Sequence, residues 1–444
     1  MKVRWAARRR AWHPVLMTGF STRQLHAGER ADQGVTPRVT PIFLTSGFEI
    51  DNFDAAGDLF AGGDGYSYTR VGNPTATAVE RRIADLEGGA EAILVGSGQA
   101  AVAVALLGLV QAGQHVVSAE HIYEGTRGFF LDNLAPLGVE TDFVHDINDP
   151  AEWERLIRPT TRVLFAESIA NPRNEILDIE AIAAVARAHG IPLVVDSTFA
   201  TPYLVRPLEH GADLVVHSAS KFLAGHGAVL GGVIVDNGAF DAARSGDLFP
   251  QFAAPTRTGG PSLVDRVGGR ARIVYLRDVM ALRFGPTPSP FNAFLINQGI
   301  ETLSLRVQRQ SDNALGVARW LQAQPEVESV DYSGLESHPD HALAQRYLPN
   351  GQGSVYSFTL RGGLEAARAL VNTLEVFTHM TNLGDVRSLI LHPGTTSHNQ
   401  RSDEQLDRTG IRAGTLRLSI GIEDLPDLIA DLDRGLAAVR ALSI

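Results

Sequence analysis

The sequence contains no cysteine and almost no lysine, although it is 444 residues long. Without cysteine the chain has no disulfide bond, no thiolate metal ligand and no cysteine nucleophile. This composition fits the reducing cytoplasm, which is the predicted location. Long apolar runs are also missing, since none approaches the ~18 residues of a membrane-spanning helix. The net charge of −11 makes nucleic acid an unfavourable partner. We therefore expect no nucleic-acid, membrane or metal partner.

Arginine replaces lysine almost throughout, because only Lys2 and Lys221 are lysines among the 39 basic residues. Lys2 belongs to a basic segment without acidic residues, residues 1–16, which lacks the apolar core of a secretory signal. We predict a basic, disordered leader at residues 1–18. A start codon read too early, ahead of Met17, explains such a leader best, and a transit peptide is the alternative.

Lys221 is the one lysine outside the leader. It follows the apolar run at residues 214–216 and a Ser-Ala-Ser stretch, where a parallel strand would end. Ligands bind at such strand ends in open α/β sheets. A primary amine can lose its proton and attack a carbonyl to form a Schiff base, which a guanidinium cannot do. A leftover surface lysine is the alternative, but the position favours a catalytic amine.

A carboxylate accompanies this amine, because Asp196 ends the apolar run PLVVD ahead of Lys221. An amine and a carboxylate on neighbouring strand ends suit pyridoxal phosphate. The lysine would form the imine, and the aspartate would keep the pyridine nitrogen protonated so that the ring accepts carbanion electrons. The alternative role for Asp196 is a helix N-cap.

Short apolar runs alternate with helical stretches between residues 74 and 236. This alternation predicts a mostly parallel sheet covered by helices on both faces. The expected strands lie at residues 92–95, 115–118, 141–144, 163–166, 192–196, 213–217 and 232–235. A helix at residues 74–87 is expected before them, because Asn-Pro precedes it and Gly-Gly ends it.

The rest of the chain predicts a second, smaller α/β unit. Residues 237–290 are rich in Gly, Pro, Ser and Arg and are expected to be irregular, and residues 292–322 are expected to be helical. Strands at 354–360 and 416–420 and helices at 364–374 and 424–442 follow. We expect a leader at 1–18, an N-terminal arm at 19–73, a large cofactor-binding domain at 74–290 and a small C-terminal domain at 291–444.

A glycine-rich turn, GSGQA at residues 96–100, joins a predicted strand to a predicted helix. Free backbone N–H groups at that helix start would hold a phosphate, with Ser218 and Ser220 adding hydroxyl groups. Local backbone capping is the alternative role for the two serines. A dinucleotide-binding oxidoreductase is the alternative class, although Ala101 stands where its third glycine would be.

Five further residues are candidates for ligand binding. Tyr68 and Arg70 lie just before a helix and could clamp a phosphate. Tyr123 follows a strand and could stack on a planar ring, and Asn171 follows another strand and could bond the ring hydroxyl. Arg417 lies in an apolar strand and requires an anion, such as a substrate carboxylate. The alternative for Tyr68 and Arg70 is a structural loop, and for Tyr123 it is ordinary packing. For Asn171 it is an Asn-Pro turn, and for Arg417 an internal salt bridge.

The motifs follow one another in the order of the Cys/Met-metabolism family of pyridoxal-phosphate enzymes, which the chain resembles over about residues 19–442. They are YSYTRVGNPT, GSGQAA, AESIANP, VVDSTFATPY, HSASKFLAGHG and LRLSIGIEDLPDL. The resemblance implies the PLP-dependent transferase fold, known as fold type I. FSTRQLHAG, SPFNAFLINQGIETLSLR, VFTHMTNLGDVRSLILHPGTTSH and the 237–290 insertion resemble the O-acetylhomoserine sulfhydrylase branch of the family.

The resemblance also implies a role for each candidate residue. It makes Lys221, Asp196, Tyr123 and Tyr68 catalytic, and it assigns the substrate carboxylate to Arg417 with Asn382 nearby. It implies that Tyr68 and Arg70 come from the neighbouring subunit, so that a dimer is the minimal active unit and a tetramer the usual assembly. The implied cofactor-binding residues are Tyr68, Arg70, Gly98, Gln99, Tyr123, Asn171, Asp196, Ser218, Ser220 and Lys221.

The implied reaction is γ-replacement, in which sulfide or a thiol displaces acetate from O-acetyl-L-homoserine and gives L-homocysteine for methionine biosynthesis. The alternatives are an O-succinylhomoserine sulfhydrylase, a cystathionine or methionine γ-lyase, and a cofactor-holding protein without turnover. Three features depart from the family pattern. Ser220 stands where Thr is usual, Glu124 stands where Gly is common, and residues 252–262 read FAAPTRTGGPS.

Overall fold

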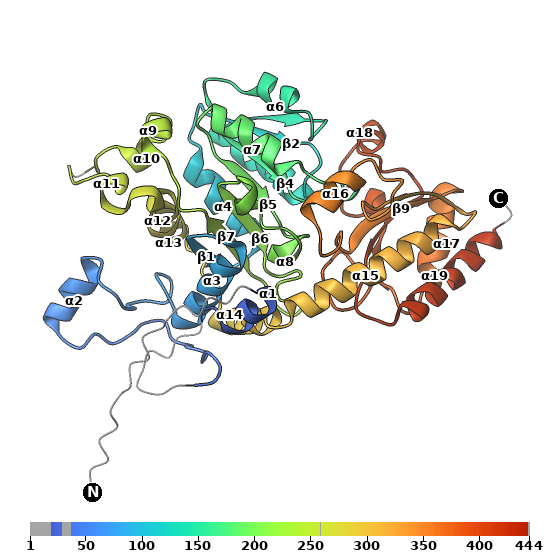
Figure 1. Cartoon of the computed structure of the whole chain (residues 1–444), viewed down its shortest axis with the longest axis horizontal. Helices are drawn as coiled ribbons and strands as arrows, with labels where there is room; N and C mark the ends of the chain where they lie inside the picture. The colour runs from blue at the N-terminus through green and yellow to red at the C-terminus, as the bar shows by residue number, and fades with distance from the viewer. Residues whose placement is uncertain (1–18, 29–36, 258, 443–444) are drawn as a thin grey trace, which may run out of the picture.

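The computed structural model describes residues 19–28, 37–257 and 259–442, and the predicted leader lies outside the described residues. A seven-stranded sheet forms the centre of the larger part of the chain, in the order β1-β7-β6-β5-β4-β2-β3 (Figure 1). Each expected strand is confirmed, with ends within two residues of the prediction. The strands are β1 (Glu91–Val95), β2 (His115–Ala119), β3 (Glu140–Val144), β4 (Thr161–Glu167), β5 (Leu193–Asp196), β6 (Leu214–Ser218) and β7 (Gly232–Asp236).

The sheet is mostly parallel. Strands β3, β2, β4, β5 and β6 run in one direction, and only the pairs that involve β7 are antiparallel. Strands β2 and β7 are buried at every position. Because successive residues of a strand point to opposite faces, a strand buried at every position is covered on both faces. The predicted architecture is therefore confirmed.

Helix α3 (Pro74–Glu87) begins and ends at the residues that the sequence predicts. The Asn73 side chain accepts a hydrogen bond from the Thr75 N–H, and Pro74 takes the first helical position, where no amide donor is needed. Gly88 ends the helix with a φ of 72°, a left-handed conformation that favours glycine. The helix packs against β1 at the edge of the sheet.

A second sheet of five strands forms the smaller part of the chain, in the order β10-β11-β12-β9-β8. Its apolar core is separate from that of the large sheet and includes Val317, Leu370 and Leu432. The sequence predicted β9, β12, α17 and α19, but not β8 or the short β10 and β11. The elements are α15 (Leu303–Gln322), β8 (Val327–Asp331), β9 (Val355–Leu360), α17 (Gly363–Thr373), β10 (Thr378–His379), β11 (Leu389–Leu391), β12 (Thr415–Ser419) and α19 (Leu425–Arg440).

The prediction that residues 237–290 are irregular is wrong, because this segment forms a series of short helices. They pack around three aromatic rings, Phe240, Phe249 and Phe252, whose centroids lie 5.1–6.0 Å apart. Helices α9 (Ala242–Ser245), α10 (Pro250–Ala253) and α11 (Leu263–Val267) are too short to be stable without tertiary packing, which local sequence does not reveal. Helices α12 (Ala271–Tyr275) and α13 (Leu282–Phe284) belong to one continuous helical run, because a π-helical segment at Leu276–Ala281 joins them, and α14 (Pro290–Ile300) follows before α15.

The segment before α3 leaves large apolar side chains in solvent. Helix α2 (Phe53–Phe60) has no buried residue and stands away from the rest of the chain (Figure 1). Phe53 is 93% exposed, Phe60 79% and Leu44 78%. A concentration of exposed apolar side chains of this kind marks an interaction surface.

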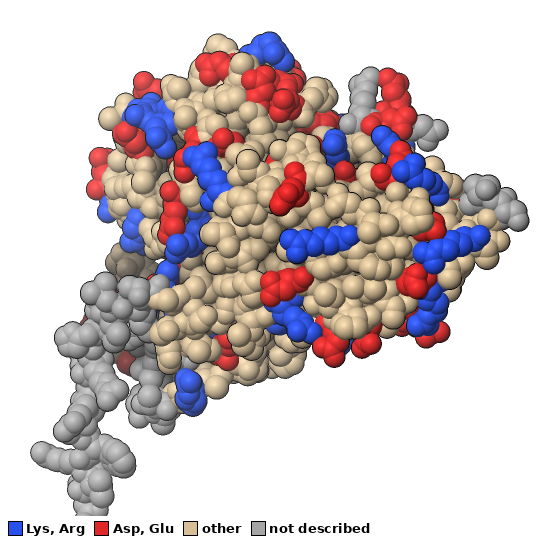
Figure 2. Space-filling model, turned by 45° about the vertical axis from the view of Figure 1, so that its right-hand side comes forward, with Lys and Arg blue, Asp and Glu red and all other residues tan. Residues whose placement is uncertain are grey.

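Charged side chains of opposite sign lie next to one another on the face shown in Figure 2. Among the ion pairs of the described residues, Arg309 and Asp424 form an exposed one at 2.9 Å. Such exposed pairs contribute only ~0–1 kcal/mol each. Among the described residues, no helix combines the length and the hydropathy of a membrane span.

Candidate active site

A cavity of about 730 Å³ lies at the carboxyl ends of the parallel strands. Strands β4, β5 and β6 end at Glu167, Asp196 and Ser218, and parallel strands place these ends at one edge of the sheet. Residues of the smaller sheet and its loops, including Arg417 of β12 and His398, complete the lining. The predicted site residues that line the cavity are Gly98, Gln99, Tyr123, Asn171, Asp196, Ser218, Ser220, Lys221 and Arg417.

Lys221 is the amine of this cavity. Its Nζ donates a hydrogen bond to Asn382 Oδ1 at 2.5 Å, so Asn382 lies at the site although it is not part of the lining. Burial of the amine, together with the positive charge of Arg417, lowers the pKa of Lys221 to about 8. A lysine with a lowered pKa is neutral more often near neutral pH, which is what nucleophilic attack on a carbonyl and proton transfer require.

Asp196 ends β5 and is held by a single neighbour. Its Oδ1 accepts hydrogen bonds from the Thr198 N–H at 2.9 Å and the Thr198 hydroxyl at 2.5 Å. Burial of the carboxyl raises the pKa of Asp196. Among the residues that the structure describes, no cation forms an ion pair with it, so the carboxylate is available for a protonated nitrogen of a ligand.

Glu167 is a site residue that the sequence analysis missed. It ends β4 directly beside Asp196 in the parallel register, and its Oε1 accepts a hydrogen bond from the Tyr123 N–H at 2.6 Å. The Asn171 N–H also donates to it. Burial, and then the charge of Asp196, raises the pKa of Glu167 well above its usual range. Glu167 lies in the motif AESIANP at the end of a predicted strand, and this position could have identified it as a site residue.

Arg417 lies on β12 and is 5% exposed. Its Nη2 donates to the Asn382 carbonyl oxygen at 3.2 Å, and its Nη1 lies 3.4 Å from Asn171 Oδ1. Burial lowers the pKa of Arg417 to about 10. Within the described part of the chain it forms no ion pair with a carboxylate, so the internal salt bridge considered from the sequence is not found there. A buried guanidinium without a counter-ion fits an anionic ligand.

The turn before α4 (Gly98–Leu109) fits a phosphate. A Cβ on Gly98 would lie 2.6 Å from the Ser218 Cβ, so only glycine permits this close approach. Gln99 Nε2 is buried and has no hydrogen-bond partner among the described residues. Ser220, in contrast, already exchanges hydrogen bonds with the Gly231 backbone at 3.1 and 3.3 Å. The unpaired amide, the helix N-terminus, the amine and the unpaired carboxylate together match a phosphorylated pyridine aldehyde.

A single chain does not bring Tyr68 and Arg70 to this cavity. They line a separate surface hollow, and Tyr68 is 46% exposed. Arg70 Nη1 donates to the Leu282 carbonyl oxygen at 2.6 Å, and its guanidinium lies 5.5 Å from the centre of the Tyr68 ring. Their assignment to the cavity of a neighbouring subunit stays a prediction.

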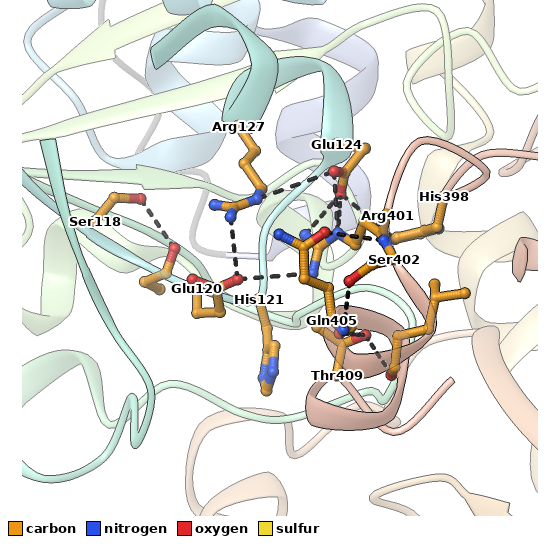
Figure 3. A network of polar contacts seen from close by, with 12 residues as sticks. Ser118, Glu120, His121, Glu124, Arg127, His398, Arg401, Ser402, Gln405 and Thr409 are labelled. Carbon is orange, nitrogen blue, oxygen red and sulfur yellow. Dashed lines mark hydrogen bonds and ion pairs between the residues drawn. The ribbon is translucent and has the colours of Figure 1, made fainter. Parts of the chain in front are cut away.

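Glu124, which departs from the family pattern, takes part in a network of ion pairs at the cavity (Figure 3). Its carboxylate accepts three hydrogen bonds from Arg401 at 2.7–3.0 Å. The sequence analysis did not identify Arg401, since 277 residues separate the two and no local pattern connects them.

Comparisons with known proteins identify the family of the chain. The model of a family described as "Cys/Met metabolism PLP-dependent enzyme" matches residues 21–437, and the chain belongs to this family. Its cofactor is therefore pyridoxal 5'-phosphate. The chain is 42% identical to the O-acetyl-L-homoserine sulfhydrylase of Corynebacterium glutamicum, over 95% of this chain and 97% of that protein. It is also 42% identical to the homocysteine synthase of Schizosaccharomyces pombe, over 95% and 99%.

A solved structure confirms the predicted fold class. It is described as an O-acetylhomoserine (thiol)-lyase from Campylobacter jejuni that contains a pyridoxyl-lysine phosphate. The TM-score is 0.88 at 36% sequence identity, and the match covers 94% of this chain and all of the other. The predicted PLP-dependent enzyme class is confirmed by the same comparisons.

The position of Lys221 predicts both a labelling site and its pH dependence. When the cofactor-free chain is incubated with pyridoxal phosphate and reduced with borohydride, we expect one labelled peptide, which contains residue 221. Because the pKa of Lys221 is lowered to about 8, the labelling rate should rise as pH rises through about 8. An exposed lysine would require a pH near ~10.4. Peptide mass spectrometry measures both, with Lys221→Arg as the unlabelled control. Label on Lys2 would contradict the assignment.

Glu167 is predicted to act in its neutral form as a positioning residue. Glu167→Gln keeps an oxygen that accepts the Tyr123 N–H and lacks the charge, so we expect turnover within about threefold of the original chain. Glu167→Ala leaves buried N–H groups without an acceptor, which costs ~1–3 kcal/mol per group and should lower cofactor affinity at least tenfold. Cofactor titration by absorbance and kcat measure the two effects. An equal loss of kcat and of cofactor affinity in both variants would show that the ionised carboxylate is required.

Proposed function

We propose that the protein catalyses γ-replacement on O-acetyl-L-homoserine, in which sulfide displaces acetate and L-homocysteine forms. The observation that carries this proposal is the near full-length similarity to relatives named for this activity, at 42% identity. The cavity is consistent with it, because it combines an amine with an unpaired guanidinium for an amino-acid carboxylate. Methionine biosynthesis in the cytoplasm is the proposed setting.

Each residue of the cavity has its own role in the proposed reaction. Bound pyridoxal phosphate supplies the electron sink for negative charge that develops on the substrate. Arg417 binds the α-carboxylate and so fixes which face of the amino acid meets Lys221. Lys221 Nζ, oriented by the Asn382 amide, removes the α-proton of the substrate and acts as the general acid and base in the later proton transfers. Asp196 keeps its partner nitrogen protonated, and Tyr123 covers the ring.

We further propose that the N-terminal arm, residues 19–73, serves the neighbouring subunit. Tyr68 and Arg70 would then complete the phosphate site of a partner, with a dimer as the minimal active unit and a tetramer as the full assembly. The exposed apolar side chains of the arm support this proposal, because the described residues leave Phe53 and Phe60 largely exposed. The large domain at 74–290 and the small domain at 291–444 remain the proposed division of the rest.

The substrate is tested by comparing kcat/KM for four amino acids. O-acetyl-L-homoserine with sulfide should be used faster than O-succinyl-L-homoserine with sulfide, cystathionine or methionine. Arg417→Ala should lower kcat/KM about 100-fold, because loss of a charge-assisted contact costs ~2–3 kcal/mol. Arg417→Lys, which keeps the charge without the two-pronged geometry, should lose less. Faster cleavage of cystathionine or methionine would contradict the proposed reaction.

The shared site is tested by mixing two inactive chains. Tyr68→Ala removes the residue that the arm contributes, and Lys221→Ala removes the amine of the receiving cavity. Under subunit exchange, some mixed dimers should hold one cavity with both residues intact, so activity should return toward about a quarter of that of the original chain. Native mass spectrometry verifies that mixed oligomers have formed. No recovery in verified mixed oligomers would indicate that each site is built within one chain.

A further inference from the structure

Four charged side chains and a histidine form a network of ion pairs at one wall of the cavity, here called the wall cluster (Figure 3). Its members are Glu120, Glu124, Arg127, His398 and Arg401. Glu124 and His398 line the cavity, whereas Arg401 does not, and its side chain is 6% exposed. Glu124 is thus the member of its ion pair with Arg401 that lines the cavity.

The wall cluster joins the two parts of the chain. Glu124 begins α5 (Glu124–Gly128), which directly follows Tyr123, whereas His398 and Arg401 lie just before α18 (Asp403–Arg408). Arg401 also lies 3.6 Å from Glu120, and Arg127 lies 3.5 Å from the same carboxylate. These contacts hold the wall in place from both sides.

The charges of the wall cluster balance. Two carboxylates, Glu120 and Glu124, face two guanidinium groups, Arg127 and Arg401. His398 Nε2 lies 3.8 Å from Glu124, and burial, opposed by that carboxylate, lowers the pKa of His398 to about 4. The imidazole is therefore neutral near pH 7. Within the described part of the wall cluster both guanidinium groups are paired with carboxylates, so an anion in the cavity would meet Glu124 rather than an unpaired arginine of the cluster.

This wall belongs to the same cavity as the proposed carboxylate site. Glu124 and His398 line that cavity together with Arg417. A cavity of about 730 Å³ falls within the ~300–1,000 Å³ of ordinary ligand pockets, so size alone does not separate a short acyl group from a longer one. Charge can separate the two kinds of acyl group instead. A carboxylate of the protein repels a ligand that carries a carboxylate at the same place.

We propose that Glu124, by neutralising Arg401 and presenting its own carboxylate to the cavity, is a specificity-determining residue that admits uncharged acyl groups and rejects acyl groups that end in a carboxylate. This inference rests on the proposed function, because it concerns the acyl group of the same amino-acid ester. It gives a physical role to the residue that stands where the family commonly has glycine.

The test removes the charge of Glu124 and compares two esters. Glu124→Gln keeps the size of the side chain and leaves Arg401 with an unbalanced positive charge. We expect the ratio of kcat/KM for O-succinyl-L-homoserine to that for O-acetyl-L-homoserine to rise about tenfold or more, because a nearby unpaired charge favours the second carboxylate. An unchanged ratio overturns the proposal.

Glu120→Gln is the matched control. It removes the same charge from the same two arginines, but Glu120 does not line the cavity, so the ratio should change less than about threefold. The double variant Glu124→Gln with Arg401→Gln restores the balance of charge, and its ratio should return toward that of the original chain. An equal rise for Glu120→Gln, or a double variant that behaves as Glu124→Gln does, overturns the proposal.

Binding provides a measurement that is independent of turnover. On the holoenzyme, calorimetry should show that L-norleucine binds more tightly than L-2-aminoadipate, and that Glu124→Gln narrows this difference about tenfold. This result would support the charge filter even if neither ester were turned over, in which case only the proposed function fails. A preference of the original chain for the succinyl ester would overturn the filter while the sulfhydrylase function stands.

Discussion

The parallel register of β4, β5 and β6 is the constraint on which the cavity depends. It places Glu167 directly beside Asp196, and Asp196 beside Val216, so that the chain leaves β6 two residues later toward Lys221. A slip of one residue in this register would turn each side chain to the opposite face of the sheet. The apolar residues of these strands fix the register. The register in turn positions the polar side chains at the strand ends, Glu167 and Asp196.

Burial then sets the charge states in the cavity. It lowers the pKa of Lys221, Arg417 and His398 and raises that of Glu167, so each group is moved toward its neutral form. Shifts of this kind gather at functional sites, because catalysis requires groups whose charge can change near neutral pH. Within the described chain Arg417 has no carboxylate counter-ion and Gln99 Nε2 has no hydrogen-bond partner, which is consistent with a site completed by the phosphate of its cofactor and by a substrate carboxylate.

Sequence and structure agree best where local signals are strong. Helix α3 carries its own start and stop residues, and the strands of the large sheet are apolar runs of ordinary length, so both were predicted closely. Helices α9, α10 and α11 also carry start signals, such as the capping box of Ser262 and Asp265, but each is only four or five residues long. Helices this short depend on tertiary packing, such as the aromatic contact between Phe249 and Phe252. Strands β10 and β11 are only two and three residues long and exist through pairing with their neighbours.

The sequence by itself determined the fold class, the cofactor and the amine. A chain that uses arginine nearly everywhere keeps Lys221 where a strand ends, and a recognisable order of motifs surrounds it. Only the tertiary structure decided which groups share the cavity and in what state of charge. It brought Glu167 beside Asp196 and joined Glu124 to Arg401, across 277 residues of sequence. Such pairings depend on the packing of distant elements and on the loss of solvent, and neither is encoded in a local pattern.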